Sequence, residues 1–394
     1  MSLSVSPRMA GVRPSPTGAL LALVTELRAQ GRDIISLGAG EPDFDTPQHI
    51  RDAAVAAIAA GETRYTPIDG TAALKSAIQA KFRRENGLDY DTSQIIVTCG
   101  GKQALFNLCL ALLGPGDEAI IPAPYWVSYP DMVRLAGAQP VIIDAGIEQD
   151  FKLTPAQLEA RLNASTRLLV LNSPGNPTGA SYTRAELEAL GAVLEDFPDV
   201  LVVSDDIYEH IYWADEPFVS FAAACPGLLD RTVTVNGVSK GYAMTGWRIG
   251  YAGGPPAIVS AMKTVQSQST SNPCSVSQAA AQAALEGDQG PVAEMCAAYK
   301  QRHDYIVAAL NDIPGVRCRP GEGAFYAFPR VQDAIERLGL GDDSALAETL
   351  VTDAGVACVP GTAFGAPGYL RMSFACSRKT LEEAIGRLNR VLAA

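Results

Sequence analysis

The sequence has few of the features that mark a metal site, a membrane protein or a nucleic-acid binder. It contains only three histidines, and none of its eight cysteines forms a Cys-x-x-Cys pair, so no metal site is expected. The N-terminal segment has no uninterrupted apolar stretch long enough for a signal peptide or a membrane span. A net charge of −12 argues against nucleic acids and anionic membranes as partners. We therefore expect a cytoplasmic protein with free thiols.

The rest of the composition is that of a large globular chain. Its 394 residues are 47% hydrophobic and 19% charged, which is too long for one small core and too apolar for disorder. Nucleotide-binding fingerprints are absent, because "GAGEPD" (38–43) does not complete G-x-G-x-x-G and the chain lacks G-x-x-x-x-G-K-[ST]. Two domains, or one large domain with a smaller one, are expected.

Apolar runs of strand length alternate with segments of helical period in the first two thirds of the chain. The runs are "QIIVTC" (94–99), "EAIIPA" (118–123), "RLLVLN" (167–172), "VLVVSD" (200–205), "TVTVNG" (232–237) and "RIGYAGG" (248–254). Helical patterns, such as 102–114 and 184–197, lie between them. Strands that are buried on both faces and separated by helices predict an α/β fold with a mostly parallel sheet.

The pattern changes after about residue 290. A long helical segment (291–311) precedes short strands, and a terminal amphipathic helix covers 379–392; the short strands are expected around 323–328, 355–360 and 369–375. We predict three parts: an N-terminal arm (1–45) that completes part of the small domain, a large domain (46–290) and a small α+β domain (291–394).

Five of the predicted strands run directly into an unusual polar motif. The motifs are "CGGKQ", "PAPYWVSYP", "NSPGNPTG", "SDDIYEH" and "NGVSKGY". In open α/β sheets, ligands bind in the crevice outside the carboxyl ends of the strands. The five motifs therefore predict one shared site.

Two charged residues stand where a buried strand ends. Lys240 follows such a strand, and partial burial lowers the pKa of an amine and makes it a nucleophile for carbonyl compounds. Asp205 ends another apolar strand, so its carboxylate needs a cationic partner, for which a protonated pyridine nitrogen would serve. The alternatives are a metal ligand, which the few histidines disfavour, or a helix N-cap, which could be Asp206.

Three other motifs each allow a functional and a structural interpretation. Gly100, Gly101 and Lys102 predict a phosphate cradle at a helix start, or only a tight turn. Trp126 offers a flat face to a heteroaromatic ring, or is a core residue. Asn176 could donate its amide to a ring oxygen, or could belong to a turn.

A carbonyl cofactor that has a pyridine nitrogen and a phosphate gives every motif a role. Lys240 would form a Schiff base with it, and Asp205 would pair with its pyridinium. The other contacts would be to the phosphate (Gly100, Gly101 and Arg248), the ring face (Trp126) and the ring oxygen (Asn176 and Tyr208). This cofactor is pyridoxal 5′-phosphate (PLP).

Taken together, the motifs resemble those of the class I, fold-type I aminotransferases, most closely the bacterial aspartate aminotransferase branch. The resemblance spans nearly the whole chain: "ISLGAGEPDFDTP" (35–47), "TRYTP" (63–67), "GGKQALFN" (100–107), "PAPYWVSYPDM" (122–132), "NSPGNPTGA" (172–180), "SDDIYEH" (204–210), "VNGVSKGYAMTGWRIGYA" (235–252) and "LRMSFACS" (370–377). It implies the PLP-dependent transferase fold type I, with a mostly parallel seven-stranded sheet flanked by helices and a smaller α+β domain. Ser239, the residue before the lysine, also fits this family.

The resemblance also implies roles that the residues alone do not reveal. Arg371 would grip the substrate α-carboxylate with the backbone of Gly40, near Asn176 and Trp126, although the sequence alone favours a surface charge. Tyr65 would reach the cofactor phosphate of a neighbouring subunit, so a homodimer with two shared sites is expected. The small domain would close over the substrate.

The distal carboxylate of an acidic substrate needs cations and small polar groups of its own. The stretch 267–278 contains no second arginine. In the bacterial branch, residues of the N-terminal segment and of the Gly-rich loop bind this carboxylate. The matching positions in this sequence are Arg13, Thr17 and Lys102.

The predicted reaction is a ping-pong transfer of the amino group from aspartate, or a similar acidic amino acid, to 2-oxoglutarate. Lys240 would carry the proton between the substrate and the cofactor. The alternatives are a glutamate/aspartate–prephenate aminotransferase, or another PLP fold-type I enzyme such as a lyase or an aromatic aminotransferase. A ligand-sensing domain of a transcription regulator is disfavoured by the acidic charge.

Overall fold

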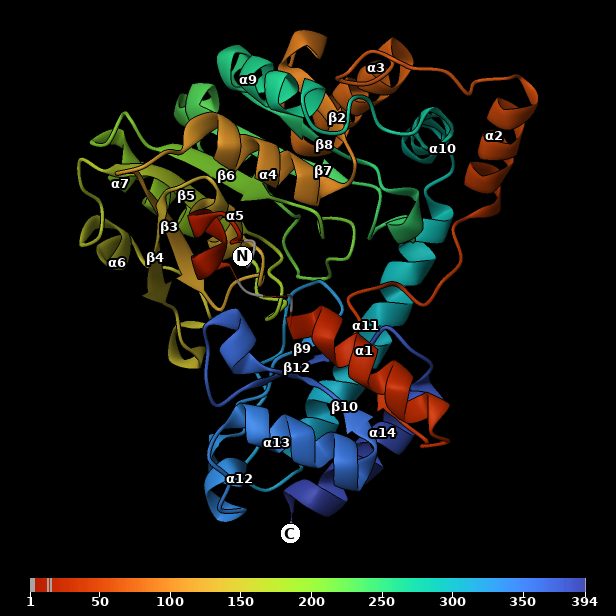
Figure 1. Cartoon of the computed structure of the whole chain (residues 1–394), viewed down its shortest axis with the longest axis vertical. Coiled ribbons are helices and arrows are strands. Elements are labelled where there is room, and N and C mark those ends of the chain that lie inside the picture. Colours follow the sequence, from red (N-terminus) through yellow and green to blue (C-terminus); the bar gives the residue numbers. More distant parts are fainter. Residues whose placement is uncertain (1–3, 13, 15, 394) are drawn as a thin grey trace.

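A seven-stranded sheet forms the centre of the upper lobe in Figure 1, in a computed structural model that describes residues 4–12, 14 and 16–393. The strand order is β2-β8-β7-β6-β5-β3-β4. The strands are β2 (Ile95–Thr98), β3 (Glu118–Ala123), β4 (Gln139–Asp144), β5 (Thr166–Asn172), β6 (Leu201–Asp205), β7 (Thr232–Gly237) and β8 (Gly250–Gly253). Within this sheet, β8 runs antiparallel to both neighbours and the others are parallel. The predicted mostly parallel sheet is confirmed.

Helices flank this sheet and build most of the lower lobe (Figure 1). Those of the upper lobe are α2 (Gln48–Ala59), α3 (Ala72–Lys81), α4 (Gly101–Leu112), α5 (Tyr129–Leu135), α6 (Pro155–Glu159), α7 (Arg184–Glu195), α8 (Phe221–Ala224), α9 (Pro256–Ser267) and α10 (Ser275–Glu286). The lower lobe contains α1 (Pro16–Ala29), α12 (Gln332–Arg337), α13 (Asp343–Thr349) and α14 (Arg378–Leu392). The long α11 (Gly290–Asn311) runs from one lobe to the other. The helices expected at 102–114, 184–197, 291–311 and 379–392 are all present.

Both faces of the sheet are covered, as strand β5 shows. Leu168 and Val170 pack on the side of α4, α5 and α9. Leu169 and Leu171 pack on the opposite side, against α6, α7 and α8. Since successive side chains of a strand alternate between the two faces, burial on both requires a continuous apolar run, which the sequence has here.

The lower lobe has two small sheets of its own. Strands β11 (Val359–Pro360), β12 (Leu370–Ser373) and β9 (Tyr326–Ala327) form an antiparallel sheet. Strand β1 (Ile35–Ser36) pairs in parallel with β10 (Val356–Ala357), so the N-terminal segment contributes to this lobe. Among the described residues, no helix is both long and apolar enough to cross a membrane.

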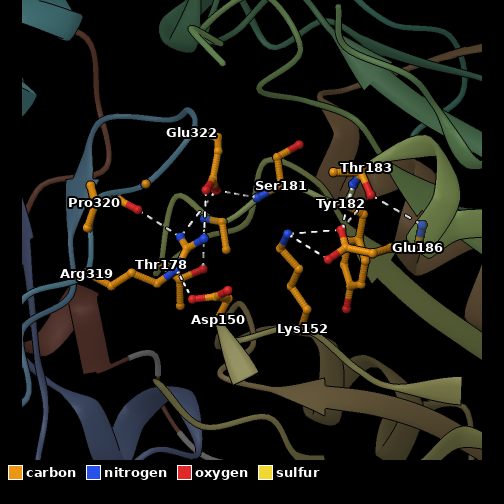
Figure 2. A network of polar contacts seen from close by, with 12 residues as sticks. Asp150, Lys152, Thr178, Ser181, Tyr182, Thr183, Glu186, Arg319, Pro320 and Glu322 are labelled. Atoms are coloured by element: carbon orange, nitrogen blue, oxygen red, sulfur yellow. Dashed lines mark hydrogen bonds and ion pairs between the residues drawn. The ribbon is translucent and has the colours of Figure 1, made fainter. Parts of the chain in front are cut away.

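Ion pairs and backbone hydrogen bonds join the two lobes beside the loop that carries Asn176 (Figure 2). Arg319 donates to Asp150 (2.5 Å) and to Glu322 (2.7 Å). Glu322 in turn accepts from the backbone N–H of Ser181 (3.0 Å), while the carbonyl of Gly179 accepts from the N–H of Glu322 (2.8 Å). This contact fixes the lower lobe against the loop that follows β5.

His303 stabilises the same contact in its neutral form. Its Nε2 accepts from the backbone N–H of Gly321 (3.0 Å), which only an unprotonated nitrogen can do. The side chain lies on α11 and is 4% exposed. Burial lowers its pKa below the ordinary value of 6.5, although Asp304 opposes the shift.

This arrangement predicts a loss of stability in mild acid. The unfolded chain binds a proton at His303 more readily than the folded chain does, so the contribution is complete above the unfolded pKa and is lost as the pH falls. We expect the contribution of His303 to the free energy of unfolding to decrease between about pH 7 and about pH 5, so the wild type should lose stability relative to His303→Gln across this range. Denaturant titrations across this range test the prediction, and an unchanged pH dependence in the variant would contradict it.

Candidate active site

A cavity of about 470 Å³ lies between the two lobes, at the carboxyl ends of the parallel strands. Most of the residues predicted for the site line it together: Gly40, Gly101, Lys102, Trp126, Asn176, Asp205, Tyr208, Ser239, Lys240, Arg248 and Arg371. They come from strand ends far apart in the sequence and from both lobes. The cavity is therefore the crevice that the strand-end motifs predict.

Lys240 extends into this cavity just after β7. Its Nζ donates to the carbonyl oxygen of Gly40 (2.6 Å), and the residue is half-buried. Burial, together with the positive charge of Arg371, lowers the pKa of Lys240 to about 8. The amine therefore loses its proton more readily than that of an ordinary lysine, as a nucleophile requires.

Asp205 lies at the end of β6 and is 5% exposed. Its Oδ2 accepts from the hydroxyl of Tyr129 (2.6 Å), and its Oδ1 from the backbone N–H of Ile207 (3.4 Å). Burial raises the pKa of Asp205 to about 6, although Tyr129 opposes the shift. Within the described part of the chain, no lysine, arginine or histidine forms an ion pair with this carboxylate, so its cationic partner has to come from a ligand.

Asp206 does not act as the helix N-cap that the sequence allows. It is fully buried, turns follow it, and its Oδ1 accepts from the hydroxyl of Ser204 (2.6 Å). Burial raises the pKa of Asp206 well above its ordinary value. The N-cap interpretation is wrong because the chain turns back after β6 instead of entering a helix.

Arg371 is buried on β12, only 2% exposed, so the interpretation as a surface charge is wrong. It donates to Oδ1 of Asn176 (3.0 Å) and to the carbonyl of Gly38 (2.7 Å). The rings of Tyr326 and Phe364 lie 4.6 and 4.9 Å from its guanidinium carbon. Among the described residues, Nε has no hydrogen-bond partner and no carboxylate pairs with this arginine, which leaves its charge for an anionic ligand.

The start of α4 forms a second cationic corner of the site. Gly100 has φ +81°, and a Cβ there would lie 2.4 Å from a guanidinium nitrogen of Arg248, so only glycine fits. Lys102, the second residue of α4, lines the cavity, and its Nζ lies 4.8 Å from the ring centroid of Trp126. Burial, with the charge of Arg248, lowers the pKa of Lys102. A helix N-terminus beside two cations favours an anion such as a phosphate.

Asn176 and Tyr208, which are predicted to contact the ring oxygen of the cofactor, form hydrogen bonds with other protein groups in this structure. Oδ1 of Asn176 bonds to Arg371, and the backbone N–H of Asn176 donates to Asn172 (2.8 Å). The hydroxyl of Tyr208 lies 2.8 Å from that of Tyr326. Both side chains are buried at the cavity wall.

The sequence from residue 32 to residue 388 matches the family described as aminotransferase class I and II. The chain belongs to this family. The predicted family resemblance is thereby confirmed, and the chain is an aminotransferase.

Curated relatives match this aminotransferase along their full length. The aspartate/prephenate aminotransferase of Nitrosomonas europaea is 53% identical over 99% of this chain and 100% of its own. That of Cereibacter sphaeroides is also 53% identical, over 98% and 97%.

Solved structures share the fold. The aspartate aminotransferase of Rhizobium meliloti superposes with a TM-score of 0.95 at 45% identity and 99% coverage of both chains. The Thermus thermophilus aspartate aminotransferase with maleate gives 0.93 at 43% identity, over 99% of this chain and 100% of that one. The fold predicted from the sequence, an α/β aminotransferase with a seven-stranded sheet, is confirmed.

Gly100 and Tyr65 are predicted for the site but are not among the residues that line this cavity. Tyr65 is 92% exposed. Arg13 lies outside the described residues, and so does the side chain of Thr17, although its backbone belongs to α1. The roles of Tyr65, Arg13 and Thr17 stay predictions, as do those of the residues that line the cavity.

Sequence reasoning missed two tyrosines that hold the site together. Tyr129 donates to Asp205, and its ring packs edge-on against Trp126 at 5.3 Å between centroids. Tyr326 pairs with Tyr208 and stacks on Arg371. Tyr129 stands in the motif "PAPYWVSYP", three residues after Trp126, so that motif already contained the signal.

Proposed function

We propose that this aminotransferase uses PLP to move the amino group of aspartate, or of a similar acidic amino acid, to 2-oxoglutarate. One observation carries the proposal: three groups face one cavity, namely a lysine with a lowered pKa, and a buried carboxylate and a buried arginine that have no oppositely charged partner among the described residues. Full-length similarity to aspartate/prephenate aminotransferases supports the substrate class.

The residues of the cavity fit PLP. The orphan carboxylate of Asp205 suits a pyridinium nitrogen, and the glycine at position 100 leaves room for a phosphate beside Arg248. Lys240 supplies the amine, and Trp126 supplies a flat apolar face. Ser239, Asn176 and Tyr208 complete the proposed contacts. When bound, PLP supplies a carbonyl that condenses with amines and a ring that withdraws electrons from the substrate α-carbon.

The protein's own side chains supply proton transfer and charge stabilisation. Lys240, with a pKa of about 8, can take the proton from the substrate α-carbon as a base and return it as an acid. Asp205, which is only 5% exposed, would stabilise positive charge on the ring nitrogen. The two lobes enclose the cavity from both sides, and closure of the lower lobe would exclude water further.

Two ends of the substrate need separate anchors. Arg371, with Gly40 and Asn176, would hold the α-carboxylate. Lys102, with Arg13 and Thr17, would hold the distal carboxylate of aspartate or glutamate. Prephenate is a second candidate acceptor, since it also has two carboxylates and the relatives at 53% identity are named for it.

The test is a panel of amino donors mixed with the purified, PLP-loaded protein, with the loss of visible absorption followed over time. Aspartate and glutamate should react fastest, and adding 2-oxoglutarate or prephenate should restore the band. Faster reaction with neutral aromatic or branched donors would contradict the acidic specificity. Absence of any amino transfer would contradict the proposed function itself.

Replacing Arg371 by leucine should weaken every α-carboxylate substrate alike. The substitution removes a charge-assisted pair of hydrogen bonds, so kcat/KM should fall about a hundredfold for aspartate and glutamate together. Steady-state kinetics with both donors check this. Retained affinity would show that another cation grips the α-carboxylate.

A second copy of the chain would complete the site. Tyr65 and the apolar residues Val55 and Ile58 of the nearby helix α2 are 92%, 65% and 58% exposed on the single chain. Such a patch suits burial against another subunit, where Tyr65 would reach the partner's phosphate corner.

Sedimentation of the purified protein should give a dimer. Mixed dimers of Lys240→Ala and Tyr65→Ala subunits should keep one intact site, whereas full independence of the two subunits would contradict the shared site.

A further inference from the structure

A fully buried lysine behind the active site takes no part in the chemistry described so far. Lys81, at the end of α3, is 0% exposed, although an unpaired buried ammonium is costly. Its Nζ forms an ion pair with Glu209 and donates to Oδ1 of Asn86 (2.7 Å). Asn86 also donates to the second oxygen of Glu209 (2.7 Å), so both oxygens of this carboxylate are held.

The π-helical turn Phe82–Asn86 contributes two more members of this polar cluster, the exposed Glu85 and the half-buried Asn86. Glu85 approaches Lys81 at 3.5 Å and accepts from Nε2 of His210 at 2.9 Å. An insertion of this kind into a helix often accompanies a functional site. Glu85, Glu209 and His210 could surround a metal ion, but the ammonium of Lys81 already lies beside both carboxylates. The cluster therefore carries its own cation.

The cluster contacts the turn that carries the site residues Asp205 and Tyr208. Glu209 and His210 directly follow Asp205–Tyr208 in that turn, where the N–H of Glu209 donates to the carbonyl of Asp206 (2.9 Å). On the other side, His210 packs against the loop of Lys240: a Cβ on Gly241 would lie 2.8 Å from the Cβ of His210. The ring of Tyr242 lies 5.3 Å from that of His210. One cluster thus contacts both sides of the site.

From these contacts we infer that the Lys81–Glu209 pair is a positioning device, which sets where Asp205 and Tyr208 stand relative to Lys240. Burial alone would raise the pKa of Glu209, but Lys81 and His210 hold it below its ordinary value, so the carboxylate of Glu209 is ionised. A buried ion pair is often replaceable by apolar side chains with no loss of stability. What such side chains cannot supply is the directional hold on both carboxylate oxygens. The inference rests on the proposed function, because it concerns how that site is aligned.

The experiment compares Lys81→Met, Glu209→Met and the double variant with the wild type as PLP-loaded proteins. Misalignment of Asp205 and Tyr208 should lower kcat about ten- to a hundredfold in all three, because small displacements of aligned groups are costly. KM for aspartate should stay unchanged, since Arg371 lies on the other lobe. The dissociation constant of PLP, measured from its visible absorption, should rise. Arg83→Ala, which removes an exposed ion pair on the same turn, is the matched control and should change none of these.

Measurements of unfolding stability distinguish a positioning role of the Lys81–Glu209 pair from a role in packing alone. Each single variant removes the shortest ion pair of a buried charge and should unfold more easily, whereas the double variant should regain stability but keep the low kcat. Recovery of wild-type kcat and PLP affinity together with stability in the double variant would overturn the inference. A wild type without amino transfer would instead refute the proposed function. The two failures are therefore distinguishable.

Discussion

Lys240→Ala should lose transamination by at least about a thousandfold in kcat, since it removes both the amine that holds PLP and the group that moves the proton. The half-buried position of this lysine and its depressed pKa of about 8 are the physical basis. The variant should still fold and bind PLP through the phosphate corner at Gly100 and Arg248, but without the visible absorption of the wild type.

Absorption spectra and steady-state kinetics measure both effects. Lys379→Ala is the matched control, because Lys379 is exposed on α14 and far from the cavity lining. It should keep the spectrum and the rate. Transamination by Lys240→Ala near the wild-type rate would remove the assignment.

Asp205→Ala should lower kcat about a hundred- to a thousandfold, the size expected when a preorganised charge in a dry site is removed. Asp205 is the one acid at the cavity wall that ends a buried strand and has only a tyrosine and a backbone N–H as partners among the described residues. Without its carboxylate, the ring nitrogen of PLP would lose its proton and the ring its capacity to accept electrons.

Two further variants of this pair show whether charge is the cause. Asp205→Asn keeps the shape and should lose nearly as much activity as alanine, since an amide cannot stabilise a pyridinium. Tyr129→Phe removes only the hydrogen bond to Asp205 and should cost about tenfold or less in kcat. A merely twofold effect of Asp205→Ala would refute its role as the partner of the ring.

Long apolar runs made most of the fold predictable. Strands such as β5 are buried on both faces, so their sequences are continuously hydrophobic and easy to recognise. Strand β4 lies at the sheet edge, where Gln139 and Asp144 are exposed and Pro140 lacks an N–H. Its sequence therefore lacks the continuous apolar run by which the other strands are recognised.

The sequence predicts those site residues whose position in the fold follows from the secondary structure around them. Residues at strand ends, such as Lys240 and Asp205, meet because parallel strands end at one edge. Contacts between distant segments give no such signal: Tyr129 reaches Asp205 across 76 positions, and Lys81 reaches Glu209 across 128. The burial of Arg371 likewise depends on how the lower lobe packs, which no local pattern contains.

Borohydride reduction of the PLP-loaded protein, followed by proteolysis and mass spectrometry, identifies the amine that holds the cofactor. Reduction fixes the cofactor covalently to whichever amine holds it. We predict a phosphopyridoxyl group on Lys240, stoichiometric with the chain and absent after prior conversion with aspartate. A label on another lysine, such as Lys102, or no label at all, would contradict it.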